Sequence, residues 1–139
     1  MKKLVYFYEC LQGGVATTTA ERLAMLKRYF AVTYLVSHYD DVKGGRHVYD
    51  FLQKNGIPLR QLFDQKQSCG DGSQLREAFG RYVDQEKPDI LIIPTTHPAC
   101  RMIGRVAREK KVPLICSEIR DQIQFKKEVA EFEYLHDVP

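Results

Sequence analysis

Short apolar runs alternate along this chain with longer stretches in which apolar residues recur at helical spacing. Four runs are rich in β-branched or aromatic residues: Lys3–Glu9, Val32–Ser37, Asp89–Pro94 and Val112–Ser117. Pro58–Phe63 follows a turn and predicts a fifth, short strand. Val32–Ser37 and Asp89–Pro94 are apolar at nearly every position, as expected where helices cover both faces of a parallel sheet. The pattern therefore predicts strands that alternate with helices, with Asp89–Pro94 as a central strand.

The segments between these runs have the period of amphipathic helices. Thr18 and Glu21 form a capping box, which predicts that the first helix begins at Thr18, and Leu23, Leu26 and Phe30 would form its buried stripe. We therefore expect the residues before Thr18 to form the turn that precedes this helix.

Four further helices follow from the same spacing. A short one around Val48–Leu52 should stop at Asn55-Gly56, and Ser73–Glu86 should form a longer one. Pro98 suits the first position of the next helix. A last helix is indicated by an apolar stripe whose partner surface the sequence does not identify: Phe125, Val129, Phe132 and Leu135.

Five strands joined by right-handed helical crossovers make an α/β fold, a three-layer, doubly wound, Rossmann-like and mostly parallel five-stranded sheet. In such sheets ligands bind at the carboxyl ends of the strands, near the point where the strand order reverses. The segments to consider for a site are therefore Glu9–Ala16, His38–Arg46, Thr95–Pro98 and Ser117–Asp121.

Composition narrows the class of protein. The 139 residues are 44% hydrophobic and 28% charged, which suits a single domain over residues 1–139. A net charge of +3, spread along the chain, argues against nucleic acid as a partner.

The first apolar run is too short for a signal peptide or a membrane span, so we expect a cytoplasmic protein. The four cysteines and four histidines lack ligand-type spacing, so we expect no metal and no cofactor.

The turn after the first strand contains Gly13, Gly14 and Val15. It lacks the spacing of a dinucleotide fingerprint and the Gly-Lys-Ser/Thr of a P-loop, which disfavours NAD and ATP binding. Two glycines before a helix N-terminus would still let a hydroxyl or anion approach free backbone N–H groups. A plain tight turn explains the same residues equally well.

Single missing residues argue against two further classes of protein, an enzyme with a catalytic cysteine and a phosphorelay receiver. Cys10 follows the first strand, but a phosphatase would need Arg where Ala16 stands, and a redox enzyme would need a second nearby cysteine. A phosphorelay receiver would need Lys after the fifth strand, where Ser117 and Glu118 stand. Both classes are disfavoured.

His97 is the candidate catalytic residue. It follows the most apolar strand, where an imidazole could hydrogen-bond or deprotonate a hydroxyl group. Its structural alternative is a helix cap before Pro98. Glu118 and Arg120, after the fifth strand, could bind substrate or could form a structural ion pair.

Three motifs can be compared with a known family: the Gly13-Gly14-Val15 turn before a helix, the Lys87–Ile93 run KPDILII, and the Val112–Glu118 run VPLICSE. Together they resemble the N-terminal, acceptor-side half of GT-B glycosyltransferases, in particular the retaining family 4 type. The last motif departs from the family at Ile119, where the usual residue is histidine, which puts a catalytic role for that turn in doubt.

The resemblance implies a sugar-transfer enzyme whose acceptor lies over Gly13-Gly14 and near His97, with Glu118 and Arg120 also binding substrate. It implies a sugar or lipid-linked acceptor, a C-terminal domain that binds the nucleotide-sugar donor, and peripheral membrane contact. The family's paired glutamates, E-x7-E, belong to that other half, and no two glutamates here have this spacing. The chain would then be the acceptor-binding domain, inactive alone because transfer needs donor and acceptor in one cleft.

A function of a different class is also compatible with this fold. The chain could be a stand-alone flavodoxin-like or universal-stress-like module that binds a small ligand or a protein without catalysis. A Gly-x-x-Gly loop after the fourth strand would favour that interpretation, and Thr95–Cys100 does not supply one.

Overall fold

A computed structural model describes residues 1–8, 13–38, 45–64, 72–94 and 98–116. Strands and helices alternate along the chain in the order β1 (Lys3–Phe7), α1 (Gly13–Leu26), β2 (Ala31–Val36), α2 (Arg46–Lys54), β3 (Leu59–Gln61), α3 (Ser73–Glu86), β4 (Ile90–Ile93), α4 (Pro98–Glu109) and β5 (Leu114–Cys116). All neighbouring strands are parallel, in the order β3-β2-β1-β4-β5. The structure confirms the predicted α/β, Rossmann-like class.

The strand order reverses at β1. From β1 the chain moves outward to β2 and β3, then crosses through α3 to β4 on the other side of β1. β1 and β4 therefore pair directly, with Tyr6 opposite Ile92. β1 occupies the middle of the sheet, and β4 is an interior strand beside it.

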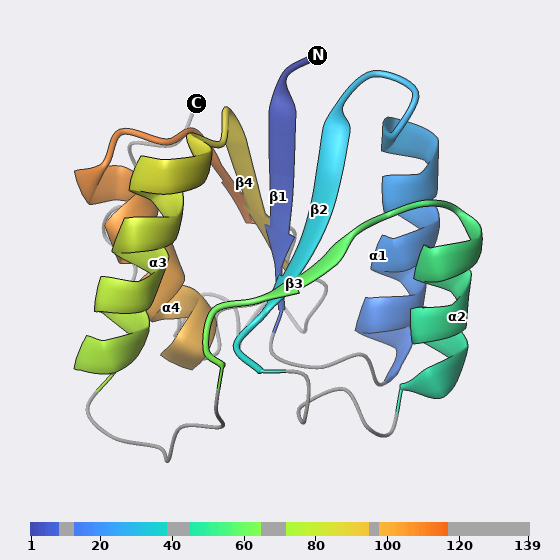
Figure 1. Ribbon diagram of the computed structural model, residues 1–139, viewed down its shortest axis with the longest axis horizontal. Coiled ribbons are helices and arrows are strands. Elements are labelled where there is room, and N and C mark those ends of the chain that lie inside the picture. The colour runs from blue at the N-terminus through green and yellow to red at the C-terminus, as the bar shows by residue number, and fades with distance from the viewer. Residues whose placement is uncertain (9–12, 39–44, 65–71, 95–97, 117–139) are drawn as a thin grey trace, which may run out of the picture.

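The sheet is covered on both faces, which gives three layers (Figure 1). Leu4 and Tyr6 of β1 pack with residues of α1 and α2, and Val5 and Phe7 pack with residues of α3 and α4. We call these two sides the α1/α2 face and the α3/α4 face. Because successive strand residues point to opposite faces, most positions of the interior strands β1 and β2 are buried, which explains their continuous apolar runs.

The start of α1 corrects the sequence prediction. The helix begins at Gly13 rather than Thr18, so the predicted capping box lies inside the helix. Ala16 and Ala20 are 0% and 2% exposed and extend the buried stripe of Leu23 by two turns. Burial of this face against the sheet outweighs a local cap motif, because most helix stability in proteins comes from packing.

Other helix ends follow the sequence closely. α3 spans Ser73–Glu86 and α4 begins at Pro98, both as predicted. Lys87 ends α3 in a left-handed conformation with φ of 50°, directly before Pro88. The last predicted helix, around residues 125–135, lies outside the described residues.

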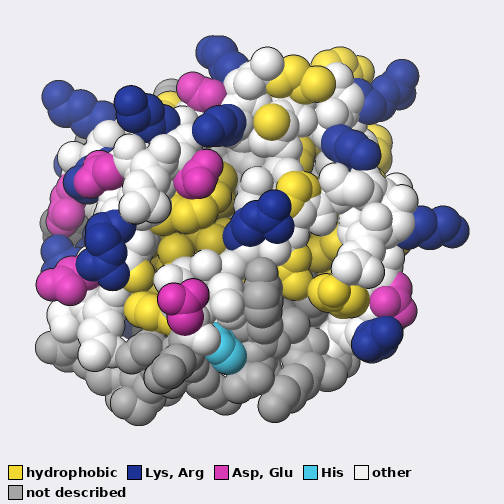
Figure 2. Space-filling view, in the orientation of Figure 1, with side chains coloured by type: hydrophobic (Ala, Val, Ile, Leu, Met, Phe, Trp, Pro, Cys, Tyr) yellow, Lys and Arg dark blue, Asp and Glu magenta, His cyan; other side chains and the backbone are white. Residues whose placement is uncertain are grey.

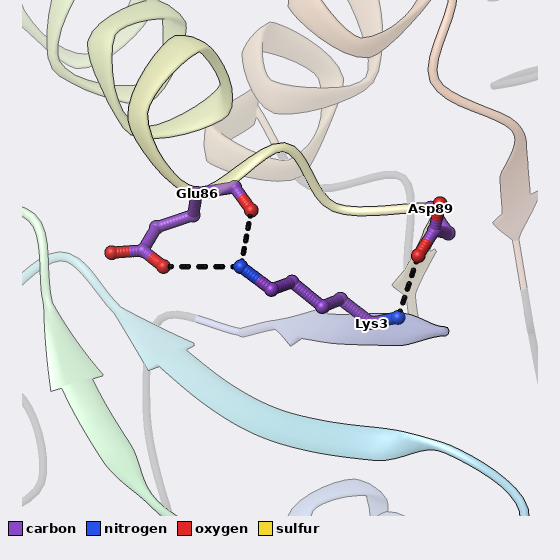
Figure 3. A network of polar contacts seen from close by, with 3 residues as sticks. All are labelled: Lys3, Glu86 and Asp89. Carbon is purple, nitrogen blue, oxygen red and sulfur yellow. Dashed lines mark hydrogen bonds and ion pairs between the residues drawn. The ribbon is translucent and has the colours of Figure 1, made fainter. Parts of the chain in front are cut away.

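Lys3 contacts the connection between α3 and β4 at the amino edge of the sheet (Figure 3). Its backbone N–H donates to Asp89 Oδ2 over 2.7 Å, and its Nζ donates to the Glu86 carbonyl over 2.8 Å. The Glu86 carboxylate lies 3.7 Å from the same Nζ. These contacts join the start of β1 to the end of α3 and the approach to β4, the connection that creates the reversal of strand order.

The surface around β3 carries both hydrophobic and charged side chains. Figure 2 shows hydrophobic side chains on both flanks of this edge strand, with Lys, Arg, Asp and Glu scattered around them. The basic side chains on this view do not form one continuous groove.

Candidate functional site

The carboxyl ends of β1 and β4 are the centre of the candidate site. Adjacent parallel strands lie about 4.8 Å apart, so the chain leaves the sheet at neighbouring points after Phe7 and after Ile93. The helices that follow, α1 and α4, therefore both begin at this edge. This is the switch point at which doubly wound sheets bind ligands.

Gly13, Gly14 and Val15 form the first turn of α1, not a turn ahead of it. The first four N–H groups of a helix have no partner within the helix, and the helix dipole is positive there. The described structure thus places three of the predicted substrate-binding residues at an N-terminus directed toward the carboxyl edge. The backbone can offer N–H donors to a hydroxyl or an anion at this position.

The remaining predicted site residues, His97, Glu118 and Arg120, lie outside the described residues. Cys10 lies outside them as well. The described neighbours fix only where these segments begin, since Pro94 precedes His97 by three positions and Cys116 ends β5 just before Ser117. Their roles stay predictions.

His47 is a polar residue near this edge to which sequence analysis assigned no role. Its Nε2 lies 3.2 Å from Thr17 Oγ1, so the hydrogen bond joins the beginnings of α1 and α2. His47 is exposed, on the second residue of α2. No spacing in the sequence relates positions 17 and 47. Only the parallel order of β1 and β2 brings the two helix starts together.

Aromatic rings pack together near the end of β1. The Tyr6 and Tyr34 rings meet edge to face with centroids 4.9 Å apart, and Tyr8 meets Tyr6 at 6.5 Å. Tyr6 and Tyr34 are 0% exposed. Such pairs resist displacement because they bury large areas with a preferred geometry. These rings belong to the packed core of the α1/α2 face.

A groove of about 480 Å³ lies elsewhere, between α3 and α4. Its charged lining includes two ion pairs that join the helices, Arg76 with Glu109 at 3.3 Å and Lys110 with Asp84 at 3.0 Å. These cations and carboxylates satisfy one another, and the groove has few apolar side chains to hold a ligand. We interpret it as a helix packing seam.

Tyr82, on α3, has a clearly shifted pKa. Burial, and to a lesser extent the negative charge of Glu86, raises its pKa to about 12, while Arg60 acts in the opposite direction. The phenol is therefore neutral near pH 7. It packs against the core of the α3/α4 face, so its shift reflects packing rather than the candidate site.

Two negative findings concern the described residues alone. They contain no set of three or more His, Cys, Asp or Glu side chains arranged to hold a metal ion. None of their helices has the length and apolar character that a membrane crossing requires.

Comparison with known proteins gives matches by structure only. No protein-family model matches the chain, and a search of curated proteins gives no significant match. Among solved structures, MurG from Acinetobacter baumannii has a TM-score of 0.58 at 19% identity, over 85% of this chain and 35% of MurG. The UDP-GlcNAc 2-epimerase from Neisseria meningitidis, solved with UDP-GlcNAc bound, has a TM-score of 0.59 at 15% identity, over 84% of this chain and 32% of the epimerase.

A third neighbour is a single domain of similar size. The C-terminal domain of the PF1911 hydrogenase from Pyrococcus furiosus has a TM-score of 0.54 at 13% identity, over 83% of this chain and 90% of that domain. At these identities the likeness establishes the fold alone. The chain spans about a third of the length of MurG and of the epimerase.

Proposed function

We propose that this chain is the acceptor-binding domain of a GT-B type glycosyltransferase whose second domain binds the nucleotide-sugar donor. The observation that carries the proposal is the direct pairing of β1 with β4, which makes the strand that precedes the Gly13-Gly14 helix start and the strand that precedes His97 neighbours in the sheet. The GT-B resemblance of the three sequence motifs points to the same class. MurG and a UDP-GlcNAc 2-epimerase among the structural neighbours support it at the level of fold.

The acceptor would lie over the first turn of α1. Gly13 and Gly14 carry no side chains that would keep a sugar ring away from the backbone. Hydroxyl oxygens of the acceptor can accept hydrogen bonds from the free N–H groups of this turn. His97 would orient or deprotonate the attacking hydroxyl, and Glu118 and Arg120 would bind further polar groups of the substrate.

Transfer requires a second domain. Attack on the anomeric carbon needs the donor and the acceptor in one closed cleft, and orientation of two reactants accounts for much of an enzyme's rate enhancement. The chain spans about a third of each enzyme to which it is similar, which leaves room for a donor-binding half. The proposal therefore assigns binding of a sugar or lipid-linked acceptor to this chain and donor binding to its partner domain.

The test is to map acceptor binding on the intact chain by ¹⁵N-labelled NMR. Titration with mono- and disaccharides should shift the amides of Gly13–Val15 together with those of Thr17 and His47. Matched titration with inorganic phosphate separates sugar recognition from general anion binding at a helix N-terminus. Shifts confined to the α3/α4 groove, or identical shifts with phosphate and sugar, would overturn the assignment of an acceptor site.

The alternative is a stand-alone module that binds a small ligand or a protein, and one observation favours a function outside sugar transfer. The chain covers 90% of the PF1911 domain, so a domain of this size and fold also occurs outside sugar transfer. Calorimetric titration with FMN tests the flavodoxin-like version of this alternative. Micromolar FMN binding, combined with no response to saccharides, would favour the module over the transferase domain.

A further inference from the structure

One part of the sheet has an apolar surface that the described helices leave partly open. Ile90 and Ile92 of β4 pack at the margin of the α1/α2 face, and Ile115 of β5 pairs with Ile92 in register. Register partners in a parallel sheet point to the same face, so the three isoleucines form one surface, which we call the β4–β5 strip. Ile115 is 49% exposed, one of four large hydrophobic side chains classed as exposed in the described part of the chain.

Exposure rises steadily along one row of this face. The row runs from Tyr34 through Tyr6 and Ile92 to Ile115, across β2, β1, β4 and β5. Tyr34 and Tyr6 are 0% exposed, Ile92 is half-buried, and Ile115 is half-exposed. The cover that α1 and α2 provide therefore ends before β5.

The position of β5 at the edge does not explain this exposure. On the α3/α4 face, the row Val5, Leu91 and Leu114 crosses the same strands β1, β4 and β5. Those side chains are 3%, 0% and 4% exposed, because α3 and α4 cover them. The same edge strand is thus fully buried on one side and open on the other.

We propose that the β4–β5 strip is the docking surface of the chain's own segment 125–135. This segment has the apolar stripe Phe125, Val129, Phe132 and Leu135, for which the sequence identified no partner surface. A helix of 11 residues is about 16 Å long, enough to extend over the whole of β4 and β5, which have four and three residues. The proposal does not depend on sugar transfer and can fail without affecting it.

The connection is long enough for this docking. β5 ends at Cys116, and residues 117–124 precede the stripe. Eight residues span up to about 26 Å when extended, more than a return along β5 requires. A tethered segment also has a high effective concentration at a surface on its own chain.

A second copy of the chain is a weaker fit to the strip. A specific protein interface buries about 800 Å² per partner, far more than three partly exposed isoleucines provide. A single helix with a four-residue stripe matches a surface of this size. Its opposite side carries Lys127, which would face water, and Lys126 and Glu131 lie on its flanks.

Docking would have a consequence for the candidate site. Glu118 and Arg120 lie in the connection between β5 and the stripe. Anchoring both ends of that connection removes conformational freedom before any ligand binds, so less entropy is lost on binding. The segment would act as a positioning element for those two side chains.

The direct test is NMR on the intact wild-type chain with labelled isoleucine methyl groups and protonated aromatic rings. We expect nuclear Overhauser contacts from the Ile115 methyl to the ring of Phe125 or Phe132. An isotope-filtered experiment on mixed labelled and unlabelled chains separates contacts within one chain from contacts between copies. Contacts between copies, or none to either ring, would overturn the proposal.

A second test uses trypsin, which cuts after Lys126 and Lys127. Phe132→Asp should speed release of the C-terminal peptide by about tenfold, since proteolysis follows the population of the undocked form. Ala130→Asp introduces the same charge on the opposite side of the predicted helix and should change the rate by no more than about twofold. Ile115→Thr, which keeps a β-branched residue in β5, should also speed cleavage. Equal rates in Phe132→Asp and Ala130→Asp, or no effect of Ile115→Thr, would contradict docking on the strip.

Discussion

Gly72 occupies a position where the backbone conformation and a close neighbouring side chain both favour glycine. It precedes α3 with φ of +86°, a conformation that costs little only for glycine, and an added Cβ would lie 2.7 Å from Met102 Cε. We expect Gly72→Ala to lower the free energy of unfolding by about 1–2 kcal/mol. Gly80→Ala is the matched control, because its Cβ would meet Lys110 Cε at an ordinary 3.8 Å inside a helix. That change should raise stability by about 0.5–1 kcal/mol, and urea unfolding that ranks the two variants otherwise would contradict the explanation.

His97 has two interpretations that differ in what its loss would change. If the imidazole orients or deprotonates the acceptor, His97→Ala in the enzyme assembled with its donor domain should cut the transfer rate by about 10² or more, with little change in Tm. If it only caps α4, stability should fall by about 1 kcal/mol and turnover should barely change. Rate and Tm measured on the same variant separate the two. Unchanged turnover with lowered Tm would remove His97 from the site.

Tyr82 links stability to alkaline pH. Its folded-state pKa of about 12 lies above the value near 10 expected in the unfolded chain. Between these values the unfolded state binds fewer protons than the folded state, so stability falls as pH rises. Its contribution is fully present below pH 10. Tyr82→Phe should make the fall in unfolding free energy between pH 9 and 12 less steep, and parallel pH curves for the two proteins would refute the assignment.

At the scale of elements, a substitution in the first turn of α1 should change both the stability of the helix and the binding of a ligand at its N-terminus. Gly14 is helical, so Gly14→Ala should raise the free energy of unfolding by about 0.5–1 kcal/mol. The same methyl group would stand where the proposed acceptor approaches the backbone, so saccharide binding should weaken. Gly80→Ala provides the comparison, since it should raise stability and leave binding unchanged. Gly14→Ala with wild-type saccharide affinity would move the acceptor away from this turn.

Helix ends could be predicted where backbone chemistry decides them. The Lys87-Pro88 end of α3 and the Pro98 start of α4 follow from the restrictions that proline places on its own φ and on the residue before it. The start of α1 could not be predicted this way. Its extra turn is stabilised by burial of Ala16 against strands that the local sequence does not reveal.

At the scale of the whole molecule, calorimetry can test the proposal that the acceptor and the donor bind to different domains. The turn after the first strand has neither the P-loop motif nor the dinucleotide fingerprint, and the proposed role of this chain leaves donor binding to another domain. Titration with UDP-, GDP- and ADP-sugars should therefore show no micromolar binding. A tight complex with any of the three would contradict the division into acceptor and donor halves.

The sequence by itself determined the alternation of strands and helices, because burial on two faces requires continuous apolar runs and amphipathic helices require their 3.6-residue period. It also placed the candidate site at the ends of strands. The tertiary structure decided which strands are neighbours: β1 with β4, fixed by the crossover of α3 and by the Lys3 contacts to Glu86 and Asp89. It alone brought His47 to Thr17 and left Ile115 open. Contacts between residues 30 or more positions apart depend on the order of strands in space, and no local pattern encodes that order.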